Sequence, residues 1–186
     1  MRIEKTAVDA SYLAYHDALT GLPNRRLLLD RLNQAIAQAA RQMKHAALVF
    51  FEVAGFKEIN DILGHAGADK LLQAVAQRLA TCLRAADTAC HYGENEFIVL
   101  LPEIDSELGV TVVEQKIRGQ LTAAYLIDGV TIRIALNIGT AVYPIHARDH
   151  RDLIQLADTA LYRWKTNADT LTGGLTIDRK LIPNKS

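Results

Sequence analysis

The sequence is poor in several features, and each absence narrows the class of protein. Its 186 residues include two cysteines, Cys82 and Cys90, too few for a zinc cluster or a disulfide framework. No apolar run approaches the ~20 residues of a membrane-spanning helix, and no basic segment followed by an apolar core opens the chain. We therefore expect a cytoplasmic location and no membrane contact in this segment.

An excess of charge of either sign is also missing. The 21 lysine and arginine residues balance 21 acidic residues, so the formal net charge is zero. A protein that wraps nucleic acid neutralises many phosphates with a basic surface, which this composition does not provide. We therefore expect no nucleic-acid partner, and any phosphate must be bound by a local site.

The length and the apolar content predict one globular domain. The chain is 49% hydrophobic, and at ~100–200 residues per domain it forms one unit with its own core. Residues 1–16 mix apolar and charged side chains at a loosely helical spacing, which predicts an N-terminal linker helix. We place the domain itself at residues 17–169 and a loosely held C-terminal tail at 170–186.

The hydrophobic pattern switches between a helical period and short apolar runs. Residues recurring every three or four positions predict helices, and continuous or β-branched runs predict strands. The turn Gly93-Glu94-Asn95 joins two extended segments and predicts a hairpin. We expect helices over 23–43, 56–83 with a break at 64–67, 110–121 and 152–164, and strands over 46–51, 87–92, 96–101 and 130–142. This order predicts an α+β fold with a central, mostly antiparallel sheet flanked by helices.

Two local features of the pattern carry candidate chemistry. The segment 51–57 ends a strand and opens a helix, where free backbone N–H groups and Lys57 suit a phosphate. The hairpin tip 91–97 crowds carboxylates onto a turn, which suits a hard divalent cation that also binds phosphate oxygens. Taken singly, both features are also typical of ordinary turns.

A set of motifs follows in a fixed order along the chain: Asp17-x-Leu-Thr-Gly-Leu-Pro-Asn-Arg25, Phe56-Lys-x-Ile-Asn-Asp61, Gly64-His, Asp69, Gly93-x-x-Glu-Phe97, Ile138-Gly-x-x-x-Tyr-Pro144, Ala157-Asp-x-Ala-Leu-Tyr162 and Lys165. From about residue 17 to 165 this order resembles the GGDEF domain of diguanylate cyclases. The resemblance implies a nucleotide-cyclase palm-like, ferredoxin-like fold. It also implies that two GTP molecules, one held by each of two facing domains of a homodimer, condense to cyclic di-GMP with release of pyrophosphate.

The resemblance implies a site for Mg²⁺ or Mn²⁺ and also shows where this chain departs from the family. The first metal carboxylate falls on Glu52, the metal-binding main-chain carbonyl on Val53, and the second metal carboxylate on Asn95. An amide supplies a neutral oxygen where the family has an anion, and Glu52 carries its charge one methylene further than the usual Asp. We therefore expect weakened metal binding, because Mg²⁺ demands near-ideal ligand placement.

The signature segment Gly93-Glu94-Asn95-Glu96-Phe97 is degenerate in a second way. Its second glycine is Glu94, whose side chain and charge are expected to crowd a triphosphate, with added strain if the backbone there has a positive φ. Glu96 matches the signature's second acid. The resemblance implies that Glu96 is the catalytic residue, a general base for the attacking 3′-hydroxyl.

The family's substrate-binding residues are better preserved. The resemblance places guanine recognition on Asn60 and Asp69 and phosphate contacts on Lys57 and Lys165, while the basic residue expected four positions further is Asp169. An amide and a carboxylate together accept and donate, as reading a base edge requires. The substrate-binding residues implied are Phe56, Lys57, Asn60, Asp69 and Lys165.

A further motif, Arg84-Ala-Ala-Asp87, falls where the family's inhibitory product site carries Arg-x-x-Asp. An arginine fork pairs with phosphate or with the guanine Hoogsteen edge, and the Asp accepts from guanine N–H groups. The motif is also frequent as a local ion pair at a helix end. A second basic residue of this site corresponds to Lys116 or Arg118, and the sequence leaves both open.

Three functions follow, and the sequence leaves enzyme activity undecided. We favour a catalytically impaired GGDEF domain that binds GTP or cyclic di-GMP as a regulatory module, beside sensor or output domains of a larger protein. The alternatives are an active diguanylate cyclase and a ligand-free dimerisation scaffold. His65 and His91 are interpreted as structural because neither has a metal-ligand partner at a suitable spacing, and Cys90 as a small buried apolar residue.

Overall fold

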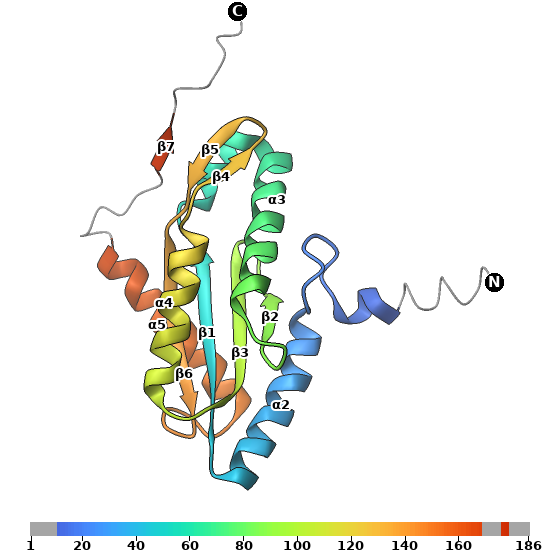
Figure 1. Ribbon diagram of the computed structural model, residues 1–186, viewed down its shortest axis with the longest axis vertical. Helices are drawn as coiled ribbons and strands as arrows, with labels where there is room; N and C mark the ends of the chain where they lie inside the picture. The colour runs from blue at the N-terminus through green and yellow to red at the C-terminus, as the bar shows by residue number, and fades with distance from the viewer. Residues whose placement is uncertain (1–10, 169–175, 179–186) are drawn as a thin grey trace, which may run out of the picture.

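The computed structural model describes residues 11–168 and 176–178, in which helices and strands follow the predicted order (Figure 1). Residues 11–15 are helical and precede the first long helix. The elements are α2 (Arg25–Gln42), β1 (His45–Val53), α3 (Phe56–Cys82), β2 (Thr88–His91), β3 (Glu96–Ile104), α4 (Glu107–Leu121), β4 (Tyr125–Ile127), β5 (Val130–Arg133), β6 (Leu136–Tyr143), α5 (His150–Ala168) and β7 (Thr176–Asp178).

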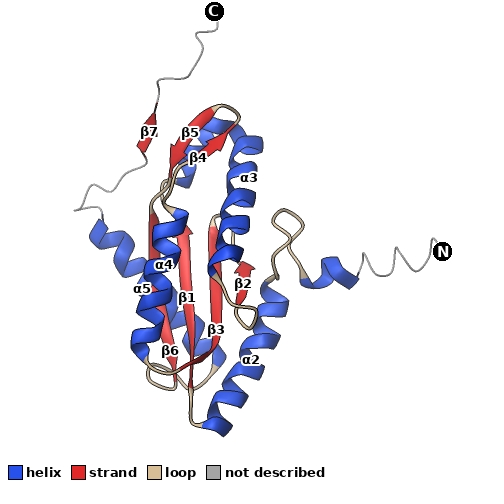
Figure 2. Ribbon diagram, in the orientation of Figure 1, coloured by secondary structure: helices blue, strands red, loops and turns tan. Residues whose placement is uncertain are grey.

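A four-stranded antiparallel sheet with the order β2-β3-β1-β6 forms the centre of the domain. Helices α3 and α4 cover one face and α2 and α5 cover the other, as Figure 2 shows in the same orientation. A small second sheet has the order β4-β5-β7. The predicted α+β, palm-like architecture is confirmed.

Strand β1 is apolar from Ala46 to Phe51 because both of its sides are covered. Phe51 and Val53 belong to the core under α3 and α4, whereas Leu48 and Phe50 belong to the core under α2 and α5. The period-two alternation therefore directs Glu52 toward the α2–α5 side. That placement matters because Glu52 is the charged residue of an otherwise apolar strand.

Gly139 in β6 lets helix α5 pack directly on the sheet. A Cβ atom at this position would meet the backbone of Ala157 and Leu161, and would lie 2.9 Å from the carbonyl carbon of Ala160. Only glycine permits such an approach without moving the helix. The glycine of the Ile138-Gly motif thus has a packing role.

Strand β6 forms an outer edge of the central sheet, and side chains cover both of its ends. At one end the Arg118 guanidinium donates to the Leu136 carbonyl at 3.0 Å. At the other end the Val142 N–H donates to His146 Nδ1 at 2.9 Å, and the His146 N–H donates back to the Val142 carbonyl at 2.8 Å. These contacts give the edge strand hydrogen-bond partners outside the sheet.

The structure differs from the predicted elements in a few places. The expected strand over 130–142 is two strands, because β5 pairs with β4 and β7 while β6 pairs with β1 in the other sheet. Helix α5 begins at His150 rather than 152, since the Asp149 carboxylate accepts from the N–H groups of Arg151 and Asp152 and caps it. Helix α4 begins at Glu107 rather than 110. The expected break in the second helix is present, with non-helical angles at Gly64.

Most of the predicted terminal segments lie outside the described residues. Of the linker helix over 1–16, residues 11–15 are described and helical, and of the tail over 170–186, only Thr176–Asp178 is described, as strand β7. Within the described part of the chain, the helices are too short or too polar to cross a bilayer.

Candidate functional site

Polar side chains form a row across three strands where β1 ends. Glu96 of β3 and Asn137 of β6 are the register partners of Glu52 on either side of it. Directly opposite residues of antiparallel strands point to the same face, with Cβ atoms ~4.5–5.5 Å apart. Glu52 is 6% exposed, and the Asn137 amide donates to its Oε1 at 2.9 Å. A buried carboxylate thereby receives a neutral donor beside a second carboxylate.

Asn95 at the hairpin tip is bonded to the end of β1 in two ways. Its main-chain carbonyl accepts from the Val53 N–H at 3.0 Å, and its side-chain Nδ2 donates to the Val53 carbonyl at 2.8 Å. The Val53 carbonyl is the oxygen that the resemblance assigns to the metal. The oxygen that the resemblance assigns to a cation therefore already accepts an amide proton.

These donors, as arranged, do not fit a divalent metal ion. Within the described residues, the structure brings together no group of three histidine, cysteine, aspartate or glutamate side chains able to hold one. The remaining candidates are Glu52, which is already hydrogen-bonded to Asn137, and a carbonyl that accepts the Asn95 amide. Mg²⁺ is held by carboxylates in near-ideal octahedral geometry, whereas this set has an amide in place of the second carboxylate and oxygens that already accept hydrogen bonds, so it lacks charge.

The hairpin tip is built around Gly93 and Glu96. A Cβ atom at Gly93 would collide with the Glu96 carboxylate, so glycine leaves room for that side chain against the turn. The N–H groups of Tyr92 and Gly93 both donate to the Glu96 carbonyl, at 2.9 and 3.3 Å. Glu94 is exposed and has no positive φ, so the strain considered for it does not arise.

A histidine connects the hairpin to the turn where the domain begins. The His91 ring contacts two segments: Nδ1 lies 2.9 Å from the Asp17 carboxylate, and Nε2 lies 3.3 Å from the Glu94 carbonyl. The main-chain N–H of His91 donates to the Pro23 carbonyl. Burial acts to raise the pKa of Asp17, but hydrogen bonds from Thr20 and the His91 interaction outweigh it, so the pKa lies below its usual value. The structural interpretation of His91 is thus supported by its contacts.

The residues expected to bind substrate lie along α3 and α5. Helix α3 starts after Gly55, which has φ +67°, and Phe56 packs into the core while Lys57 is exposed. Asn60 lies one turn beyond Lys57, so the two side chains are neighbours on the helix surface. Asp69 lies beyond the break at Gly64 and is exposed; Lys165 lies within α5, and Asp169 is outside the described residues.

The Arg84–Asp87 segment forms a tight turn after α3. The Asp87 carboxylate accepts from the Arg84 N–H at 2.9 Å, and the Asp87 N–H donates to the Arg84 carbonyl at 3.1 Å. The Arg84 side chain is exposed. Of the two residues left open for this site, Arg118 donates to the Leu136 carbonyl and pairs with Glu114. Lys116 is exposed. Burial raises the pKa of the Cys82 thiol, and the charge of Lys116 acts in the opposite direction.

Comparison with known proteins identifies the family. The family description "Diguanylate cyclase, GGDEF domain" matches residues 14–170. The chain belongs to the GGDEF domain family. Its curated relatives include the Pseudomonas aeruginosa bifunctional diguanylate cyclase/cyclic di-GMP phosphodiesterase MucR, 40% identical over 153 residues, and the diguanylate cyclase TpbB of the same species, 36% identical over 168 residues.

These matches cover 82% and 90% of this GGDEF domain, but only 22% of MucR and 39% of TpbB. Solved structures agree in fold. The GGDEF domain of TpbB is 38% identical with a TM-score of 0.80, over 82% of this chain and 90% of that one. The GGDEF domain of DgcB from Caulobacter crescentus, solved in complex with c-di-GMP, is 26% identical with a TM-score of 0.72, over 83% and 89%.

Two contacts of this GGDEF domain escaped the sequence analysis. Asn137 supports Glu52, and its signal was a polar residue inside an otherwise apolar strand. The pairing of Asp17 with His91 joins residues 74 positions apart, and nothing local in either segment indicates it.

Proposed function

We propose that this GGDEF domain is catalytically impaired and serves as a guanine-nucleotide-binding regulatory module of cyclic di-GMP signalling. The observation that carries the proposal is the hydrogen bond from Asn95 Nδ2 to the Val53 carbonyl, 2.8 Å long. It occupies the carbonyl that the family uses for its metal. Catalysis by the family needs a cation to offset triphosphate charge, and a neutral amide in place of a carboxylate removes part of that attraction.

Metal binding would require this tip to rearrange. The Asn95 amide would have to turn its oxygen inward, and the Val53 carbonyl would lose its present donor. A cation at Glu52 Oε1 would also compete with the amide of Asn137. Each change exchanges an existing hydrogen bond for a bond to the ion, so we expect weakened binding of Mg²⁺ and Mn²⁺. Glu96 keeps its carboxylate, but a general base alone does not stabilise the transferred phosphate.

Nucleotide binding places fewer demands on the altered tip. Lys57, Asn60 and Asp69 lie along α3, and none of them takes part in the Asn95–Val53 contact. The exposed side chain of Arg84, the Asp87 turn and Lys116 offer a second site, for cyclic di-GMP. Support comes from the similar GGDEF domain of DgcB, which was solved with that ligand.

The context of a larger protein fits a regulatory role. The chain spans a small part of its relatives, and MucR is named as both cyclase and phosphodiesterase. A domain that binds nucleotide without turnover reports its concentration to neighbouring sensor or output domains. Homodimerisation is not required for that role, although turnover requires two domains to face each other.

A turnover assay and a binding assay test the proposal together. At high protein concentration with GTP and either Mg²⁺ or Mn²⁺, we expect no cyclic di-GMP by chromatography, while cyclic di-GMP and GTP each raise the melting temperature. Arg84→Ala is expected to abolish the cyclic di-GMP effect, and Arg133→Ala, which removes an exposed arginine on β5, is expected to keep it. Product formation by the wild type would establish an active cyclase instead. A melting temperature unchanged by either nucleotide would leave the ligand-free scaffold.

A further inference from the structure

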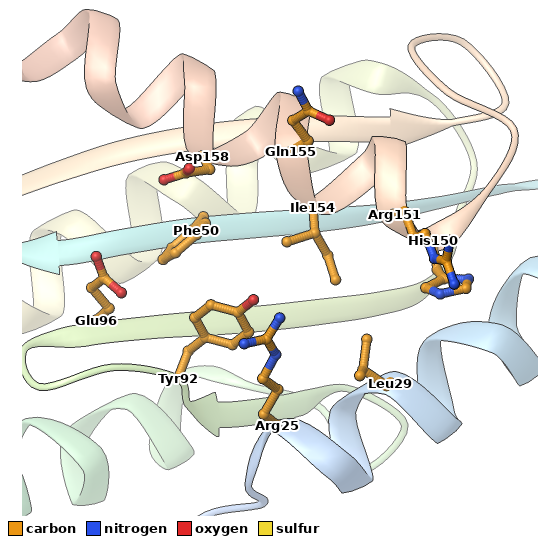
Figure 3. A pocket seen from close by; sticks show the side chains of 10 residues that line it. All are labelled: Arg25, Leu29, Phe50, Tyr92, Glu96, His150, Arg151, Ile154, Gln155 and Asp158. Carbon is orange, nitrogen blue, oxygen red and sulfur yellow. The ribbon is translucent and has the colours of Figure 1, made fainter.

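A cleft of about 580 Å³ opens between helices α2 and α5 over the central sheet (Figure 3). This volume is in the range of ligand sites, ~300–1,000 Å³. It differs from the α3 surface discussed above, because α3 covers the opposite face of the sheet. Its residues come from α2, β1, the hairpin and α5, so no single sequence motif predicts it.

The cleft has an aromatic floor. Tyr92 and Phe50 pack edge to face, with ring centroids 5.4 Å apart and planes at 74°. Ile154 of α5 faces Tyr92 across the cleft (Figure 3). The space between Tyr92 and Ile154 therefore offers aromatic and apolar surface to a flat ligand.

The polar groups of the cleft are separated by sign. Glu96 and Asp158 lie at one end, and His150 and Arg151 lie at the other (Figure 3). Arg151 and Asp158 are seven residues apart on one helix, which corresponds to ~10 Å along its axis. A ligand that spans the cleft thus meets carboxylate acceptors at one end and the Arg151 guanidinium at the other.

A second arginine reaches the cleft from the opposite helix. The Arg25 guanidinium, at the start of α2, lies 4.9 Å from the centroid of the Tyr92 ring. Among the described side chains, neither Arg25 nor Arg151 forms an ion pair. Their donors are therefore available to an anion, and a guanidinium fork matches a phosphate in bidentate fashion.

We propose that the α2–α5 cleft binds a nucleoside monophosphate, with its base between Tyr92 and Ile154, the base's N–H edge toward Glu96 and Asp158, and its phosphate held by Arg25 and Arg151. Guanine fits the acceptor end because it presents a ring N–H and an amino group side by side. A guanidinium from each of the two helices suits one phosphate group. The site is separate from the guanine-binding residues of the proposed function, and it contacts the hairpin through Glu96.

Calorimetric titration of the whole chain with 5′-GMP tests this assignment. We expect saturable binding to one site, weakened at least about tenfold by Arg151→Ala and by Arg25→Ala, since each removes charge-assisted hydrogen bonds to the phosphate. Asp158→Asn is expected to reduce the preference for GMP over AMP. Arg148→Ala is the matched control, because it removes an exposed arginine three residues before Arg151 that does not line the cleft.

Binding at the other guanine site is distinguished by Asn60→Ala. If Asn60→Ala abolishes GMP binding while Arg151→Ala leaves it intact, the nucleotide occupies the α3 site and the cleft assignment is wrong. Absence of saturable binding up to millimolar GMP also overturns it. Arg151 is exposed and its side chain has no ion-pair partner among those described, so Arg151→Ala keeps the test decisive even if Arg25→Ala affects folding.

Discussion

Replacing Asn95 by aspartate would make the stability of this domain depend on a divalent metal. In the wild type, Asn95 Nδ2 donates to the Val53 carbonyl at 2.8 Å. Aspartate removes the donor and sets a carboxylate oxygen against the carbonyl oxygen, beside Glu52 and Glu96. A lost hydrogen bond contributes ~0.5–1.5 kcal/mol and a polar group left without a partner ~1–3 kcal/mol, so we expect Asn95→Asp to destabilise the metal-free protein by about 1–3 kcal/mol.

The loss can be measured by thermal unfolding. At ~2–4 °C per kcal/mol for a chain of this size, the melting temperature in EDTA should fall by about 2–12 °C. Added Mn²⁺ or Mg²⁺ should reverse the loss in Asn95→Asp, because an ion that binds only the folded state stabilises it by ~2.7 kcal/mol at a concentration of 100 Kd. The wild type should respond much less to either metal, because its binding is weakened.

Asn95→Ala is the matched control for this experiment. It deletes the same donor without adding charge, so it should be destabilised and remain insensitive to metal. The reasoning is refuted if Asn95→Asp is as stable as the wild type in EDTA, or if metal stabilises the wild type and Asn95→Asp equally.

Three further predictions concern packing and titration. Gly139→Ala should cost at least ~3 kcal/mol in urea unfolding, because the added methyl meets the α5 backbone; a smaller cost would mean that α5 shifts freely. Burial, aided by Asp17, raises the pKa of Cys90 to about 12, so iodoacetamide at about pH 8 should modify this thiol only in denaturant. Hydrogen bonds from Thr20 and His91 hold the pKa of Asp17 below 3.8 despite burial. The ionised Asp17 should therefore stabilise the folded protein fully above pH 3.8, and this contribution should vanish as the pH falls through the lower folded-state pKa. Asp17→Asn should remove this acid-side slope in urea midpoints, and an unchanged slope would exclude the carboxylate as its source.

The fold was predictable because its signals are local. The helical period of α2 and the break at Gly64 are both visible in the sequence and present in the structure. The division of residues 130–142 between two sheets was not predictable, since both halves are β-branched and only their partners differ. The start of helix α5 differs from the predicted one for a similar reason. Its cap, Asp149, depends on which carboxylate the preceding turn brings to the free N–H groups of the first helical turn.

The candidate site was predictable in composition but not in bonding. The resemblance assigned Glu52 and Asn95 to one metal site, and the sheet register and the Val53–Asn95 hydrogen bond account for their proximity. Which way the Asn95 amide points is decided by the competition for the Val53 carbonyl, a contact between segments 42 residues apart. The α2–α5 cleft is a still clearer case, because its lining residues come from α2, β1, the hairpin and α5, which are distant in the chain.

The covered edge of β6 limits how two copies of this domain can associate. An edge strand with free N–H and C=O groups can accept a strand from another chain, which leads to sheet extension or aggregation. Here Arg118 takes the outward carbonyl of Leu136, and His146 takes both main-chain groups of Val142. Because outward groups alternate along the strand, only the short span between these ends stays open. Pairing of two domains edge to edge through β6 is thus disfavoured, and contact between copies is left to helices, loops and the other edge.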